Sequence, residues 1–175
     1  LMRLESLERA SRGTTEYGVL TRACTGKDAT PPVRLSAAQY LIERGDHASS
    51  VTVLDTLDRK SLPPEHSLTY TLTLSRCAAH GGRHAEAVAE LEAAYGSMVE
   101  ADLKQQLTQA LLDIHAVGEN GPGVAAAYVR FAEEFPDADH QYLWENAART
   151  LLRLGEGELV GGLGGQRQRP RRPVA

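Results

Sequence analysis

The stretch GGRHAEAVAELEAAY, residues 81–95, decides how the rest of the sequence is interpreted. Two glycines can end one helix, and the alanines and leucine after them recur at helical spacing on one face of a second helix. The stretch therefore predicts a turn followed by a helix. Whether it is an isolated hairpin or one copy of a recurring element determines the fold class.

The same pattern recurs along the chain at a spacing of 37 residues. Leu54, Leu91 and Tyr128 are separated by 37 and 37 residues. A recurrence of 20–50 residues is typical of stacked repeats. The sequence therefore predicts an all-α fold, an α-solenoid of antiparallel helix-turn-helix repeats with a period of about 37 residues. We call a set of residues that recurs at this spacing a column. The other columns are Ser50/Ala87/Val124, Leu57/Ala94/Phe131 and Ala37/Leu74/Leu111/Ala147, in which the last separation is 36 residues.

Turn residues predict three helix pairs and one further helix. Glycines such as Gly45 and Gly82 are expected where the first helix of a pair ends. No stretch alternates polar and apolar residues for long, so no sheet is expected. The expected pairs are 31–44 with 46–59, 64–80 with 83–96, and 98–117 with 122–135, followed by a helix at 138–154.

Three helix starts carry expected caps, and at one of them Gly45-Asp46 is expected to end one helix and cap the next. Thr30 precedes two prolines, which favours a helix start with a hydroxyl cap. Ser97 is followed three residues later by Glu100, the spacing of a capping box.

The domain organisation follows from the period. Residues 30–155 are expected to form the repeat domain, and residues 1–29 a partial N-terminal repeat or a helical extension. Running the period backwards places Tyr17 in the column of Leu54, so we expect the chain to begin inside a repeat of a longer protein. The alternative is a simple N-terminal helix that packs on the first pair. Residues 156–175 are expected to form a Gly/Arg-rich tail, solvated rather than bound to nucleic acid, an acidic protein or lipid.

Composition narrows the class of protein. Of the 175 residues, 42% are hydrophobic and 24% charged, which suits a folded, soluble chain. The net charge of −4 does not favour a nucleic-acid binder, and no apolar run approaches the ~20 residues of a membrane span. Cys24 and Cys77 do not indicate a disulfide framework, so a thiol-reducing, cytoplasmic location is favoured. No signal peptide is visible, and a removed one would leave no trace.

No catalytic constellation is evident in the sequence. It contains no GxSxG, no phosphate-binding glycine loop with lysine and no HExxH. Cys77, His80 and His84 are the best candidate metal ligands, although a packing cysteine and two surface histidines are the simpler interpretation. Glu133 and Glu134 are expected to be solvated charges. We expect no enzymatic activity, no metal and no cofactor.

The columns resemble the tetratricopeptide repeat (TPR) family over roughly residues 31–155. The 37-residue period departs from the family's 34, and Thr71 stands where the family prefers a large aromatic, so the chain is TPR-like. The position of Trp144 in its column predicts a core residue. The matching residues are Trp144, Ala147, Ala148, Leu151 and Gly155; Leu74, Ser75, Ala78, Gly82, Ala87, Leu91 and Ala94; and Val124, Tyr128, Phe131 and Pro136.

The resemblance implies a concave groove, lined by the first helices, that binds a protein or peptide. Because Leu35 and Gln39 occupy the first-repeat positions, the carboxylate clamp of one TPR subfamily is not supported. The arginines would suit an acidic or carboxylate-ended segment, or they pair with Glu145 or Asp113, or face water. The groove residues carried over are Gln39, Arg76, His80, Tyr142, Asn146, Arg149 and Arg153, together with Leu35, Glu43, Thr73, Gln109, Asp113 and Glu145.

The expected function is therefore a non-enzymatic scaffold or adaptor for protein–protein interaction. Two alternatives stay open at this point. The chain is a structural subunit of a larger assembly, or it is an accessory TPR-like domain of a multidomain enzyme or regulator.

Overall fold

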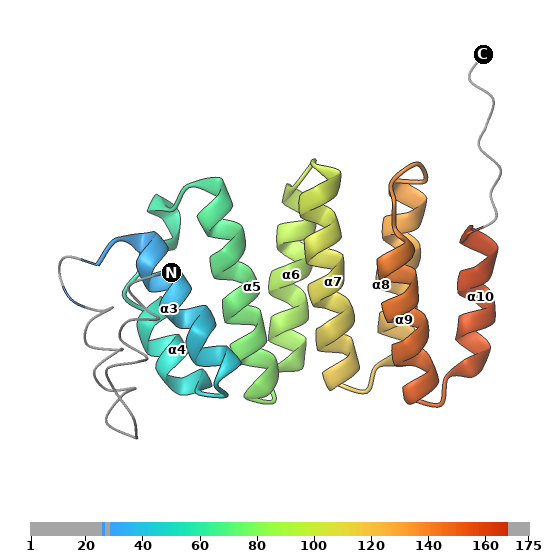
Figure 1. Ribbon diagram of the computed structural model, residues 1–175, viewed down its shortest axis with the longest axis horizontal. Helices are drawn as coiled ribbons and strands as arrows, with labels where there is room; N and C mark the ends of the chain where they lie inside the picture. Colours follow the sequence, from blue (N-terminus) through green and yellow to red (C-terminus); the bar gives the residue numbers. More distant parts are fainter. Residues whose placement is uncertain (1–25, 27–28, 168–175) are drawn as a thin grey trace, which may run out of the picture. The chain divides into compact units, whose positions relative to one another are not determined.

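The computed structural model describes residues 26 and 29–167, and every regular element in them is helical (Figure 1). No strand occurs in these residues, so the predicted all-α class is confirmed there. None of the described helices is long and apolar enough to cross a membrane. The elements are α3 (Pro31–Glu43), α4 (His47–Leu54), the 3-10 helix η1 (Arg59–Ser61), α5 (Pro64–His80), α6 (His84–Ser97), α7 (Ala101–Val117), α8 (Gly121–Glu134), α9 (Gln141–Arg153) and α10 (Gly157–Arg167).

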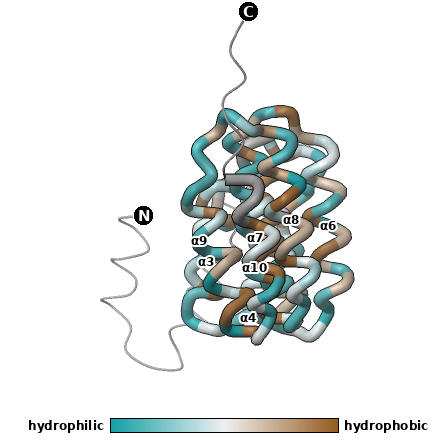
Figure 2. Tube along the Cα trace, turned by 90° about the vertical axis from the view of Figure 1, so that its right-hand side faces the viewer, coloured by the Kyte–Doolittle hydropathy of each residue, from teal (hydrophilic) through white to brown (hydrophobic). Residues whose placement is uncertain are grey.

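The chain divides into two units, Leu1–Gly82 and Arg83–Ala175. In the first unit α3, α4 and α5 pack against one another. In the second unit α7 packs between α6 and α8 and also contacts α9, while α10 packs on α8 and α9. Hydrophobic and hydrophilic residues are interspersed along the described helices, as expected for helices that each bury one side (Figure 2).

Apolar residues of the recurring columns form the cores. Leu54, Leu91 and Tyr128 are all fully buried. In the first unit Leu54 belongs to a cluster that includes Leu41 and Val53. The fully buried leucines and aromatics of the second unit are Leu91, Leu107, Leu111, Leu112, Tyr128, Phe131, Leu143, Leu151 and Leu163.

The turns after four helices share one backbone conformation. Gly45, Gly82 and Gly155 have φ of 79°, 76° and 81°, and Glu119 has φ of 52°. This left-handed conformation ends a helix by redirecting the chain, and glycine adopts it without the strain that a Cβ brings. The glycine pair of residues 81–82 is therefore the turn that the sequence predicts.

Backbone hydrogen bonds close three of these turns in the same way. The amide of Asp46 donates to the carbonyl of Leu41 at 2.8 Å. Asn120 donates likewise to His115, and Glu156 to Leu151, each at 2.8 Å. These bonds satisfy carbonyls that the end of a helix leaves free, as in the Schellman motif.

Two of the predicted helix caps are wrong. Ser97 is the last residue of α6, and its hydroxyl donates to the carbonyl of Ala94 at 2.8 Å instead of capping α7. Glu100 itself occupies the cap position of α7 and makes no capping bond. Thr30 occupies the cap position of α3 but also makes no side-chain bond, so a proline in the first turn is what favours this start. The expected cap at Asp46 is confirmed, because its side chain accepts from the amide of Ser49, and Asn120 caps α8 by accepting from the amide of Gly123.

The second helix of the first pair is shorter than predicted. It was expected over 46–59 but ends at Leu54, followed by η1. The hydroxyl of Thr56 donates to the carbonyl of Val53 at 2.6 Å, and Asp58 caps η1 by accepting from the amide of Lys60. Side chains that bond to nearby backbone in this way compete with helix continuation.

The interpretation of residues 156–175 as a tail is wrong for residues 157–167, which form α10. Leu163 is fully buried and Leu159 and Val160 are half-buried, so apolar packing on α8 and α9 offsets the low helix propensity of the glycines. Residues 168–175, with the basic end, and the expected partial repeat at residues 1–29, apart from residues 26 and 29, lie outside the described residues.

Trp144 is not the fully buried core residue that its column predicts. It is half-buried, and the preceding Leu143 is fully buried instead. The column therefore predicts the helix correctly, but the side chain that is fully buried in the core is that of Leu143, one residue before Trp144.

We predict that Glu119→Gly stabilises the protein by about 0.5–1 kcal/mol. Relief of left-handed strain is worth about 1–2 kcal/mol, and the added freedom of glycine in the unfolded chain costs about 0.4–1 kcal/mol. Glu119→Ala is the control, because it removes the carboxylate but keeps the Cβ. Urea denaturation measures both, and equal stabilities of the two variants would contradict the argument.

Candidate functional site

One face of α9 gathers four of the residues expected to bind a partner. Tyr142, Asn146, Arg149 and Arg153 are separated by four, three and four residues, so they lie along one side of the helix. Tyr142 is 66% exposed, both arginines are exposed and Asn146 is half-buried. Leu152, 64% exposed, flanks this row. We call these five residues the α9 face.

The arginines of the α9 face are not neutralised within the described residues. Neither Arg149 nor Arg153 makes an ion pair there. Glu145 instead accepts a hydrogen bond from the side-chain amide of Gln141 at 2.8 Å, and Asp113 accepts one from Gln109 at 2.8 Å. Pairing of these arginines with Glu145 or Asp113 is therefore not found, and both charges face outward.

Sequence reasoning missed Leu152 as a member of this face. A leucine in an amphipathic helix is normally assigned to the core. Its position three residues after Arg149 was the available signal, because residues three apart are neighbours on a helix surface.

Of the other expected site residues, Gln109, Asp113 and Glu145 belong to the second unit, and the rest belong to the first. Gln39 is exposed on α3, and Arg76 and His80, four residues apart, are exposed on one side of α5. Leu35 and Thr73 were also expected to line the groove. This expectation is wrong, because both side chains are almost completely buried.

His80 is held in a ring stack with His47. The two ring centroids are 4.1 Å apart with an interplanar angle of 13°. His47 is the first residue of α4, and His80 is the last residue of α5. Burial and the neighbouring His80 lower the pKa of His47. The stack therefore favours a neutral His47.

The candidate metal ligands are not assembled. Cys77 is buried in α5, while His80 is stacked on His47. In residues 26 and 29–167 no three His, Cys, Asp or Glu side chains are grouped so that they could hold a metal ion. Cys77 thus acts as a small packing residue.

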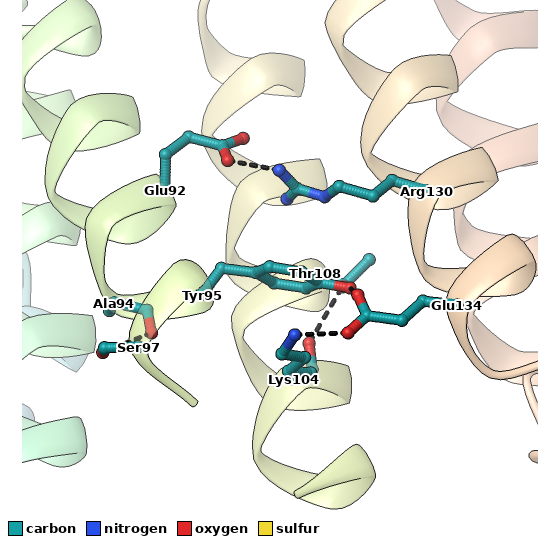
Figure 3. Close-up of polar contacts among 8 residues, drawn as sticks. All are labelled: Glu92, Ala94, Tyr95, Ser97, Lys104, Thr108, Arg130 and Glu134. Carbon is teal, nitrogen blue, oxygen red and sulfur yellow. Dashed lines mark hydrogen bonds and ion pairs between the residues drawn. The ribbon is translucent and has the colours of Figure 1, made fainter. Parts of the chain in front are cut away.

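A polar cluster joins three helices of the second unit (Figure 3). The hydroxyl of Tyr95 on α6 donates to Glu134 on α8 at 2.8 Å, and Lys104 on α7 donates to the same carboxylate. Arg130 on α8 donates to Glu92 on α6. Glu134 was expected to be a solvated charge. Its side chain is 39% exposed, and it is in addition the shared acceptor of the cluster.

Both cations of the cluster also lie over the ring of Tyr95. The guanidinium carbon of Arg130 is 3.9 Å from the ring centroid, and the Lys104 amine is 4.5 Å from it. Ring faces attract cations, most strongly where water is excluded. Tyr95 is therefore fixed by its hydroxyl at one end and by charges over its ring.

The electrostatics of the cluster depend on Lys104. Its side chain is only 10% exposed, and a buried ammonium without a partner is costly. The hydrogen bond from Lys104 is the main reason why the pKa of Glu134 is lowered, and burial is the main reason why the pKa of Tyr95 is raised. Because each charge has an opposite partner, the cluster links α6, α7 and α8 to one another.

One signal in the sequence could have found this cluster. Glu92 precedes Arg130 by 38 residues, and Tyr95 precedes Glu134 by 39. These separations are close to the 37-residue recurrence, so opposite charges about one period apart were available as a pattern.

Comparison of the chain with protein-family models, curated proteins and solved structures finds no match.

We predict that Glu134 makes the free energy of unfolding depend on pH under acidic conditions. Its pKa is below the usual 4.5 in the folded protein, so its stabilisation is complete above pH 4.5 and is lost as the pH falls through the folded pKa. Glu134→Gln should lower stability at neutral pH by about 1–3 kcal/mol, the loss typical of hydrogen bonds to charged groups. It should also flatten the acid dependence measured by urea denaturation.

Two controls accompany this measurement. Asp137→Asn removes an exposed carboxylate near the end of α8 and should leave the acid dependence unchanged. Lys104→Met with Glu134→Gln leaves no unpaired ammonium and should recover part of the stability. Retention of the full acid dependence in Glu134→Gln would contradict the assignment.

Proposed function

We propose that this protein is a non-enzymatic scaffold or adaptor, built from TPR-like helix pairs, that binds a protein or peptide on the α9 face. The observation that carries the proposal is that Arg149 and Arg153 are exposed and make no ion pair within residues 26 and 29–167, on the helix that also exposes Tyr142 and Leu152. Tyrosine and arginine are the side chains that interfaces concentrate and from which they gain most energy.

Support for recurring helix pairs comes from the regular spacing of their turns. The left-handed residues Gly45, Gly82, Glu119 and Gly155 are separated by 37, 37 and 36 residues. The helices after them begin at His47, His84, Gly121 and Gly157, with the same three separations. A shared turn at a constant spacing is what a repeated helix pair would require.

Further support comes from what the first residue of each such helix contacts. His47 stacks on His80 at the end of α5. Within the second unit, a side chain at Gly118 would meet the ring of His84 at 3.5 Å, and one at Gly121 would meet Glu156 at 2.7 Å. In each case the first residue of a second helix lies against the end of the next first helix.

The chemistry of the α9 face favours an acidic partner. Guanidinium groups bind carboxylates through two parallel hydrogen bonds and keep their charge at any physiological pH. Tyr142 and Leu152, ten residues apart on a helix, are separated by about 15 Å along its axis. An extended segment of about five residues covers that length. We therefore expect a partner segment that carries acidic residues for the arginines and apolar residues for Tyr142 and Leu152.

We predict that reversing both charges, Arg149→Glu with Arg153→Glu, abolishes binding without unfolding the protein. Both side chains are exposed, so the core is untouched, and carboxylates would be repelled instead of bound. The measurement is fluorescence polarisation with labelled acidic–apolar peptides from an array, at several salt concentrations, since screened charge pairs weaken with salt.

A matched control changes the net charge equally elsewhere. Lys60→Glu with Arg83→Glu reverses two exposed cations that are not part of the α9 face and should leave the affinity unchanged. Circular dichroism verifies that both double variants fold. If the α9 variant folds and binds with unchanged affinity and salt dependence, the α9 face is not the binding surface.

A further inference from the structure

The last described helix, α10, has an unusual composition for an element packed on the second unit. Five of its eleven residues, GELVGGLGGQR, are glycine. A glycine in a helix interior lowers the helix–coil equilibrium about fivefold relative to alanine, because the glycine backbone loses the most freedom on folding. Local propensity therefore opposes α10 strongly.

Neither the backbone nor the packing requires these glycines. Gly157, Gly161 and Gly162 do not have the positive φ that only glycine adopts easily. A Cβ added at any of the three would meet no atom within 4 Å. Alanine would fit at each position, so these glycines lower the stability of α10 without permitting a closer contact in the folded chain.

Few side chains attach α10 to the helices beneath it. Among residues 157–163, Leu163 is the one fully buried side chain, while Leu159 and Val160 are half-buried. The neighbouring α9 buries five residues, Leu143, Ala147, Ala148, Thr150 and Leu151. The packing that opposes undocking is accordingly smaller for α10 than for α9.

We propose that α10 is a detachable helix that undocks from α8 and α9 while the rest of the second unit stays folded. Undocking withdraws Leu163 and uncovers the apolar surface that it occupies on these two helices. The glycines set this opening equilibrium, because they weaken α10 alone. The inference concerns α10 and does not depend on which partner the α9 face binds.

Hydrogen exchange followed by mass spectrometry on the full chain tests the proposal. The amides of α10 should be protected, yet exchange faster than those of α7, because α10 opens separately. Gly161→Ala with Gly162→Ala should slow exchange in α10 about twenty-five-fold, the product of two fivefold steps, and leave exchange in α7 unchanged. Leu163→Ala should speed exchange in α10 alone.

Gly96→Ala is the matched control. Gly96 lies in α6 of the same unit, and a Cβ there also meets no atom within 4 Å. This substitution should not slow exchange in α10 selectively. The proposal is overturned if α10 and α7 exchange at the same rate, if the double alanine variant changes both equally, or if α10 shows no protection at all.

Discussion

The left-handed turn at the end of a helix is the constraint on which the rest of this structure depends. One residue at positive φ can end a helix and redirect the chain, and such residues stand at positions 45, 82, 119 and 155. The turns at 45, 119 and 155 bring the following helix back along the previous one, since α3 packs on α4, α7 on α8 and α9 on α10. Buried residues such as Leu91 and Tyr128 then meet apolar neighbours, because the turn has fixed the direction from which those neighbours arrive.

The turn alone does not fix how far one helix slides along another, and the polar cluster of the second unit adds that constraint. Apolar contacts are non-directional, so they tolerate small shifts. The bonds that converge on Glu134 from Tyr95 and Lys104 have defined lengths and angles, and they join α6, α7 and α8 at one level. Burial of Lys104 makes this arrangement specific, since any shift that separates it from Glu134 leaves an ammonium unpaired.

Much of the fold could be predicted because its determinants are local. The helix at 64–80 was predicted with both ends correct, and the helix at 83–96 to within one residue, because glycine turns act through the backbone of adjacent residues. Local reasoning failed where distant contacts decide the outcome. The glycines of α10 predict a tail, but Leu163 finds a buried site that no local pattern records. Ser97 and Glu100 match a capping box, yet α6 continues through Ser97 and removes it from the cap position.

In the candidate site, too, local spacing predicts some features and distant contacts decide the others. The shared side of Arg149 and Arg153 follows from their spacing, which a helix fixes. Their lack of ion pairs does not follow, because Glu145 stands at an equally suitable spacing and bonds Gln141 instead. The exposure of Leu152 also depends on which side of α9 the neighbouring helices cover. Spacing predicts which side chains share a face, whereas tertiary packing decides whether that face is open and charged.

The ion pair between buried Lys104 and exposed Glu134 also constrains how this sequence can change over generations. Loss of Glu134 alone leaves the buried ammonium of Lys104 unpaired, and selection would remove most such chains. Simultaneous replacement of both by apolar or neutral residues is far less costly. The two positions are 30 residues apart, and a lineage that has lost the glutamate should therefore also have lost the lysine.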